Sequence, residues 1–371
     1  MQYISTLFVV AASALAYDPA HAQTLYRLGT GPGGAETQVS LMSRDATGVL
    51  VRTMSGVGAG FDWFSLQNLA LGQPGIRAQW TNFGAAIAPG VSGGTQFYGT
   101  LTASPTSFVA AYSGLSGAAT PFTLQGGSVQ LGRSGFQDGN ARPVNEFVGI
   151  GNSRATGFDR PWVYRPGGPG GPFNYLAMPA GFENALAQRV SDDGRYTFGV
   201  ATTTGAARMI VWDGTSIHTS IAYPAGLSIS DVNTDGSFAV GRLNNEAVFI
   251  SRAGAITGMG SFPGGGTILP TAVSGDGSIV VGLATLSTNG AWIWTSSGGY
   301  APATSYFSSV LPAGAFVTRM DSVSEDGRTF AGQMSTTAGL EAFVITNWVP
   351  APSGGVALAF AGILAGSRRR R

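Results

Sequence analysis

The stretch Val273-Ser274-Gly275-Asp276-Gly277-Ser278-Ile279-Val280-Val281-Gly282 is one of four clear copies of the pattern V-S/N-x-D-G-x4-G. The turn pairs of the four copies are Asp193-Gly194, Asp235-Gly236, Asp276-Gly277 and Asp326-Gly327. An Asp-Gly pair favours a tight hairpin turn, because Gly readily adopts positive φ and Asp tolerates it. The apolar residues after the turn favour a strand, so each copy predicts a β-hairpin.

A further strand is expected in each copy. The four segments are Met209–Trp212, Ala247–Ile250, Ala291–Trp294 and Ala342–Ile345. The turn glycines stand at positions 194, 236, 277 and 327, a spacing typical of four-stranded propeller blades. A β-helix would repeat at a much shorter interval.

Weaker copies extend the repeat toward the N-terminus. Ser43-Arg44-Asp45, with two extra residues before Gly48, is expected to start the first copy, and Gly94 with Gly99 keeps the glycine spacing of the second. A third is expected near position 144, where Pro161–Tyr164 parallels Ala291–Trp294. Residues 23–348 therefore predict an all-β fold, a β-propeller of about seven four-stranded blades.

The order of elements predicts how the propeller closes. Leu28–Gly34 parallels Met259–Gly265, which lies at the end of a unit, whereas the last unit stops after Ile345. We therefore expect an N-terminal strand to complete the last blade, because that leaves no bare sheet edge.

Composition excludes several kinds of site. Charged residues make up 11% of the 371 residues, and all 20 basic residues are Arg, four of which end the chain. Without those four, the remaining Arg are outnumbered by 19 acidic residues, so no basic face for nucleic acid is expected. The chain has no Cys, which excludes disulfides and thiolate metal sites.

Residues 1–22 predict a signal peptide. An apolar stretch from Ile4 to Ala16 is too short to span a bilayer, and Ala20-His21-Ala22 offers a cleavage site that would leave Gln23 as the new N-terminus. Cleavage after Ala16 is an alternative, and a buried N-terminal helix is the other interpretation.

Residues 349–371 predict a sorting tail built from three elements. Val349, Pro350, Ala351 and Pro352 form a stiff extended motif, Val356 to Gly366 is an apolar run, and the chain ends in Arg368, Arg369, Arg370 and Arg371. The run is short for a bilayer span, and its basic end would stay cytoplasmic during export. An ordinary tail anchor is the alternative.

This tail resembles the PEP-CTERM family of sorting signals, although Ala351 replaces the Glu usual in that motif. The resemblance implies export by the secretion machinery, processing by an exosortase-type membrane protease, and release or anchoring at the cell surface. The V-S-x-D-G repeat also resembles the extracellular HAF repeat family, over residues 187–347 above all.

Residues that could carry chemistry are few. After signal cleavage His218 is the one histidine and is expected on an exposed strand. Calcium binding is an alternative role for Asp192, Asp193, Asp235, Asp276 and Asp326, but a single Asp beside each Gly in most copies favours a turn role. Trp162, Trp212, Trp292 and Trp294 favour a core between blades over a sugar-stacking surface. The Gly-Pro run from Pro166 to Pro172 predicts a loop.

No metal or other cofactor is expected. The favoured function is an exported binding or structural module that contacts an extracellular polysaccharide or a surface protein. The alternative is an extracellular polysaccharide hydrolase or lyase. Such an enzyme would require two or more carboxylates within about 5–10 Å of each other near the propeller axis.

Overall fold

A computed structural model describes residues 23–31, 34–54, 60–77, 83–84, 97–104, 107–113, 120–121, 135–140, 148–153, 159–164, 173–263, 265–285 and 290–348. The expected signal peptide (1–22), sorting tail (349–371) and Gly-Pro loop (166–172) lie outside these residues. The described residues form seven four-stranded sheets, each antiparallel throughout, and two short helices, α1 (Leu66–Ala70) and α2 (Ala303–Tyr306).

The strands follow the chain in groups of four. The first sheet contains β2 (Thr37–Met42), β3 (Gly48–Thr53), β4 (Gly60–Ser65) and β5 (Ile76–Arg77). The second contains β6 (Phe83–Gly84), β7 (Phe97–Ser104), β8 (Ser107–Ser113) and β9 (Thr120–Pro121). The third contains β10 (Gly135–Asn140), β11 (Val148–Ser153), β12 (Arg160–Tyr164) and β13 (Phe173–Tyr175).

The other four sheets belong to the clear copies of the repeat. The fourth contains β14 (Asn184–Val190), β15 (Tyr196–Thr203), β16 (Ala206–Asp213) and β17 (Ser216–Ala222). The fifth contains β18 (Leu227–Val232), β19 (Phe238–Leu243), β20 (Glu246–Ser251) and β21 (Ile256–Gly258). The sixth contains β22 (Thr267–Val273), β23 (Ile279–Thr285), β24 (Ala291–Thr295) and β25 (Gly299–Pro302). The seventh contains β26 (Phe316–Val323), β27 (Phe330–Thr336), β28 (Gly339–Thr346) and β1 (Thr24–Arg27).

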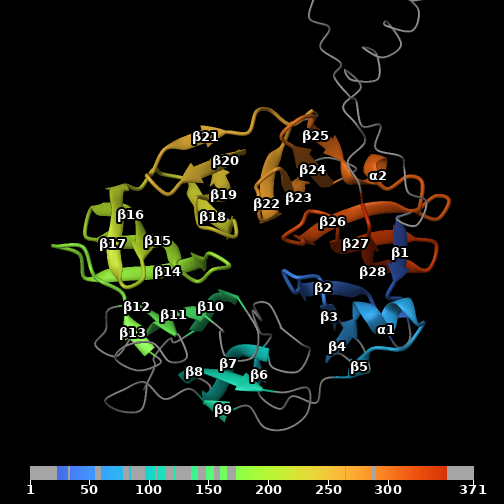
Figure 1. The fold of residues 1–371 in the computed structure, drawn as a ribbon, viewed down its shortest axis with the longest axis horizontal. Coiled ribbons are helices and arrows are strands. Elements are labelled where there is room, and N and C mark those ends of the chain that lie inside the picture. Colours follow the sequence, from blue (N-terminus) through green and yellow to red (C-terminus); the bar gives the residue numbers. More distant parts are fainter. Residues whose placement is uncertain are drawn as a thin grey trace, which may run out of the picture.

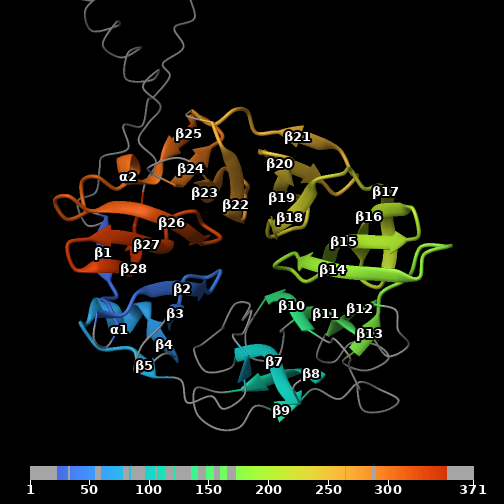
Figure 2. The ribbon, with the colours of Figure 1, turned by 180° about the vertical axis from the view of Figure 1, so that it is seen from behind.

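The sheets follow one another around a common centre, with the first strands, such as β2, β14, β18, β22 and β26, nearest the middle (Figures 1 and 2). The N-terminal β1 pairs with the last strand β28, in the register Thr24↔Thr346 to Arg27↔Phe343. Figure 1 shows the two ends of the described chain side by side in this sheet.

The apolar core lies between successive sheets. One cluster joins Val240 and Ala247 of the fifth sheet to Val280 and Trp292 of the sixth. Trp162, Trp212 and Trp292 are buried, in agreement with a core role, whereas Trp294 is half-buried and packs edge-on against Phe249. Buried aromatic side chains such as Trp292 thus contribute to the packing between sheets.

Candidate functional site

The Asp-Gly turns of sheets four to seven share one hydrogen-bond pattern. Each Asp Oδ1 accepts from the backbone N–H two residues later, at 2.9 to 3.0 Å, and from the Ser or Asn side chain two residues earlier. The four acceptors are Asp193, Asp235, Asp276 and Asp326. The following glycines Gly194, Gly236, Gly277 and Gly327 have φ between +64° and +72°. One carboxylate oxygen is thus used within each turn, as a turn-forming Asp requires.

The first copy uses the same turn with a different residue at its tip. Gly48 N–H donates to Ser43 Oγ at 3.0 Å, five residues apart, as Tyr196 N–H does to Ser191 Oγ. Ala46, with φ +55°, therefore takes the place of the turn glycine. The expectation of two extra residues before Gly48 was wrong, because Gly48 corresponds to the first residue of the returning strand.

The second glycine of the pattern faces a β-bulge. Each innermost strand of sheets four to seven shifts register opposite this position. A Cβ on Gly199 would lie 2.0 Å from the carbonyl oxygen of Leu186, and one on Gly282 would lie 2.2 Å from that of Leu269. The glycine permits this close backbone approach. The bulge bends the inner strand and changes the direction in which its neighbouring side chains point.

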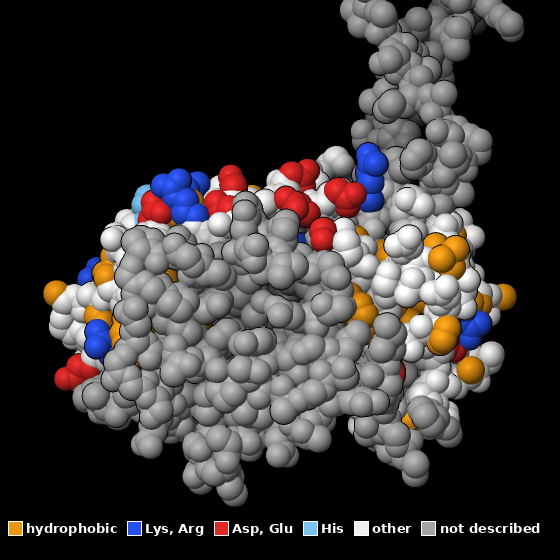
Figure 3. Space-filling view, turned by 60° about the horizontal axis from the view of Figure 1, so that its bottom comes forward, with side chains coloured by type: hydrophobic (Ala, Val, Ile, Leu, Met, Phe, Trp, Pro, Cys, Tyr) orange, Lys and Arg blue, Asp and Glu red, His pale blue; other side chains and the backbone are white. Residues whose placement is uncertain are grey.

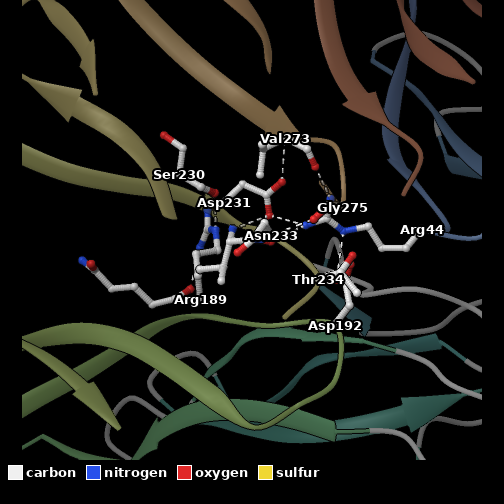
Figure 4. Close-up of polar contacts among 11 residues, drawn as sticks. Arg44, Arg189, Asp192, Ser230, Asp231, Asn233, Thr234, Val273 and Gly275 are labelled. Carbon is white, nitrogen blue, oxygen red and sulfur yellow. Dashed lines mark hydrogen bonds and ion pairs between the residues drawn. The ribbon is translucent and has the colours of Figure 1, made fainter. Parts of the chain in front are cut away.

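Arg44, at the tip of the first turn, joins three other sheets near the centre of the molecule (Figure 4). Its Nη2 donates to Asp231 Oδ1 at 2.6 Å and to the Val232 carbonyl at 2.9 Å. Its Nη1 donates to the Val273 carbonyl at 2.7 Å, and its Nε lies 3.2 Å from Asp192 Oδ1. One guanidinium thus binds the fourth, fifth and sixth sheets. We call Arg44, Asp192 and Asp231 the Arg44 cluster.

Both carboxylates of the Arg44 cluster have further partners. Asp231 accepts from the N–H groups of Val232 at 2.9 Å and Val273 at 2.8 Å, and Thr234 Oγ1 donates to Asp192 Oδ2 at 2.8 Å. Burial raises the pKa of Asp231, while the Arg44 charge and the Val273 N–H act against that rise. The three side chains are 8% to 19% exposed, so bulk water screens the ion pairs only weakly.

The turns themselves are tied together by backbone hydrogen bonds. Glu325 N–H donates to the Arg44 carbonyl at 2.9 Å, and Gly275 N–H donates to the Glu325 carbonyl at 2.8 Å. Asp193 N–H donates to the Thr234 carbonyl at 3.1 Å. The turns of the first and of the fourth to seventh sheets therefore meet around the Arg44 cluster.

A separate buried carboxyl lies on the seventh sheet. Asp321, on the innermost strand β26, forms an ion pair with Arg319, and its side chain is 8% exposed. Burial raises the pKa of Asp321 to about 6, even though Arg319 and Gln38 of the first sheet favour its ionised form. Asp321 occupies the bulge of its strand, as Ser230 does on β18.

Another candidate from the sequence, His218, lies elsewhere. His218 is exposed on β17 and contacts the ring of Tyr196, so the structure places it outside the Arg44 cluster. In the part of the chain that the structure describes, no group of three or more His, Asp or Glu side chains could hold a metal ion. No helix among the same residues is both long and apolar enough to cross a membrane.

The sequence pattern did not predict the Arg44 cluster. Arg44 and Asp192 both occupy the variable position of the turn pattern, and Asp231 directly precedes Val232 at the start of a copy. Charged residues at such positions were a usable signal, because the chain has so few of them. Their partners could not be read from the sequence, since the contacts join copies that are far apart in the chain.

The fold of the chain is similar to that of known β-propellers. No family model and no curated protein matches the chain. The β-propeller domain of Cps50 (Swd1) from Myceliophteria thermophila matches with a TM-score of 0.50 and 10% identity, over 86% of this chain and 99% of that domain. The chain is a β-propeller. A catalytically inactive virginiamycin B lyase from Staphylococcus aureus with quinupristin gives a TM-score of 0.46 at 12% identity, over 87% of this propeller and 99% of the lyase. Identities this low show the propeller fold alone.

Proposed function

We propose that this propeller is an exported binding or structural module whose seven sheets form one closed ring at the cell surface or outside the cell. Export rests on the signal peptide 1–22 and on the tail 349–371, which resembles a PEP-CTERM sorting signal. Ring closure is supported by the pairing of β1 with β28.

The pairing of Asp192 and Asp231 with Arg44 is the observation that favours binding over catalysis. A glycoside hydrolase generally needs one protonated carboxyl as the acid and one free carboxylate as nucleophile or base. Here both carboxylates bind the same guanidinium, and each accepts at least one further hydrogen bond. Neither carboxylate is therefore free to act as a nucleophile or base, and the shared arginine ties three sheets together, which suits a rigid scaffold.

A polysaccharide hydrolase or lyase is the second candidate, because two carboxylates do meet near the centre of the propeller. To separate the two functions, the purified protein would be incubated with a panel of neutral and acidic polysaccharides. Binding would be followed by affinity electrophoresis, and cleavage by release of reducing ends.

We expect retention of at least one polysaccharide without cleavage. Cleavage that is lost in Asp192→Asn and Asp231→Asn variants of unchanged thermal stability would establish the enzyme instead. A protein that neither binds nor cleaves any member of the panel would contradict both functions.

A further inference from the structure

Tyr196 carries three basic side chains around its ring, beside the Asp235-Gly236 turn of the fifth sheet. The Cζ atoms of Arg252 and Arg195 lie 4.0 Å and 4.9 Å from the ring centroid, and the His218 ring lies edge-on at 5.9 Å. Figure 3 shows Arg side chains with a histidine at one end of a row of acidic side chains. We call Tyr196, Arg195, His218 and Arg252 the Tyr196 patch.

The two guanidinium groups differ in what they bind. Arg195 forms a two-bond ion pair with Asp213, at 2.8 Å for both bonds. The Arg252 guanidinium has no hydrogen bond or ion pair with any side chain or backbone group that the structure describes, and its contact is the face of Tyr196. Its N–H donors are therefore available to a ligand.

The ring beneath Arg252 is fixed in place. Tyr196 is 4% exposed, and the turn of the fifth sheet lies against it so closely that a Cβ on Gly236 would be 2.6 Å from the Tyr196 Cβ. The backbone N–H of Arg252 also donates to the Ser237 carbonyl of that turn at 2.9 Å. The backbone of Arg252 and the Tyr196 ring beneath its side chain are both held in place. The guanidinium therefore has little conformational freedom left to lose on binding.

The charges around Arg252 define the class of ligand. The edge of a guanidinium pairs with a carboxylate through two parallel hydrogen bonds. The exposed Asp235 and the half-buried Asp213, which is paired with Arg195, both interact with Arg252 electrostatically, and they would repel a densely charged anion. A carboxylate oxygen would, however, accept a hydrogen bond from a sugar hydroxyl. A ligand with one carboxylate and several hydroxyl groups per unit meets both conditions.

From this geometry we infer that the Tyr196 patch binds a polysaccharide containing uronic acid, with Arg252 pairing the sugar carboxylate. The inference rests on the proposed binding function and names its ligand class and its site. Sulfated polysaccharides and acidic peptides also attract Arg252. A sulfated sugar can carry more than one charge per unit, which Asp235 would repel, and an acidic peptide offers no sugar hydroxyl groups to donate to Asp235.

The test measures binding of the purified full chain to polygalacturonate, with dextran, dextran sulfate and poly-glutamate as comparison ligands. Arg252→Gln should weaken polygalacturonate binding about tenfold or more, since hydrogen bonds between charged groups are lost. Arg252→Lys should recover only part of it, because an ammonium cannot form the two parallel bonds. Thermal unfolding of each variant checks that the fold is kept.

Arg328→Gln is the matched control, because Arg328 is exposed beside the Asp326-Gly327 turn and lies outside the Tyr196 patch. It should bind polygalacturonate as the unchanged protein does. The inference is overturned if Arg252→Gln binds normally, if Arg328→Gln weakens binding equally, or if dextran sulfate or poly-glutamate binds more tightly. Failure to bind any polysaccharide would also contradict the proposed function, whereas binding that ignores Arg252 would contradict this inference alone.

Discussion

Arg27 donates two hydrogen bonds to Glu341, from Nη2 to Oε1 at 2.6 Å and from Nε to Oε2 at 3.0 Å. The two residues lie on neighbouring strands, β1 and β28, although 314 positions separate them in the sequence. Glu341 is 1% exposed and also accepts from Thr336 Oγ1 at 2.7 Å. The pairing of the N-terminal strand therefore depends on a buried carboxylate as well as on the backbone ladder.

Replacement of Arg27 should destabilise the protein by an amount that depends on pH. The hydrogen bond from Arg27 holds the pKa of Glu341 below its usual range. Stability from this group is therefore complete above the unfolded pKa of about 4.3 and is lost as pH falls through the lower folded value. Arg27→Gln should cost about 1–3 kcal/mol at pH 7, and the difference should shrink below about pH 4.

Urea unfolding at pH 7 and at pH 3.5 measures this effect. Arg208→Gln serves as the control, because Arg208 is exposed and donates a single long bond of 3.5 Å to Ser220. Equal losses from the two variants, or a loss from Arg27→Gln that does not change with pH, would contradict the role of this ion pair.

The Arg44 cluster predicts strong coupling between its members. Arg44→Met leaves Asp192 and Asp231 buried without their shared cation, which should cost about 3–5 kcal/mol. Adding Asp231→Asn to that variant should recover part of the loss, because one uncompensated charge is removed. Urea unfolding of the two single variants and the double variant gives the coupling energy. Additive losses would show that Arg44 and Asp231 do not stabilise each other.

Local patterns in the sequence predicted the strands, and the order of elements predicted the pairing of the N-terminal strand with the last sheet, which the structure shows. They did not predict the side-chain contacts between distant copies. Asp276-Gly277 and the strand after it specify a hairpin through backbone preferences that act within a few residues. The sequence did not predict the turn at Ala46, because a non-glycine residue at positive φ is disfavoured and must be held by the surrounding bonds. Contacts such as Arg44 with Asp231 depend on the curvature of the whole array, which no short pattern encodes.

Ionisation of Asp321 should lower the free energy of unfolding as pH rises. Its folded pKa of about 6 lies above the unfolded value of about 3.9, so the folded state holds the proton more tightly. The stability it contributes is complete below about pH 4 and is lost as pH rises through about 6. Asp321→Asn should therefore gain stability relative to the unchanged protein between pH 4.5 and 8, by at most about 3 kcal/mol.

Asp276→Asn gives the opposite sign and serves as the comparison. Burial opposes ionisation of Asp276, but hydrogen bonds from Ser278 and Ser274 lower its pKa overall. That variant should therefore lose stability relative to the unchanged protein as pH rises from 3 to 6. Denaturation midpoints of both variants and of the unchanged protein, measured from pH 3 to 8, test these two signs. A difference between Asp321→Asn and the unchanged protein that does not vary with pH would exclude a raised pKa.

Export predicts two changes at the ends of the chain. Protein recovered outside the cytoplasm should begin at Gln23, because Ala20-His21-Ala22 presents the cleavage site. Removal of Val349–Arg371 should move the protein from the envelope to the medium, since that segment contains the apolar run from Val356 to Gly366. N-terminal sequencing that finds Met1, or unchanged fractionation of the truncated protein, would contradict the respective signal.

Deletion of residues 23–30 tests whether β1 closes the ring. β1 pairs with β28 along its whole length, and Leu25 packs against the cluster that contains Phe343. Its removal would strip the edge of β28 and leave Glu341 without Arg27, so the loss should reach several kcal/mol. An open array would instead lose only a frayed end, at little cost.

The same deletion offers a test by complementation. A synthetic peptide with the sequence of residues 23–30 should bind the exposed edge and raise the unfolding midpoint of the deleted protein, since a ligand of the folded state stabilises it. The same peptide with Glu in place of Arg27 should do so less well, because Glu341 would face a like charge. A deleted protein with an unchanged midpoint and no response to the peptide would show that β1 does not hold the propeller closed.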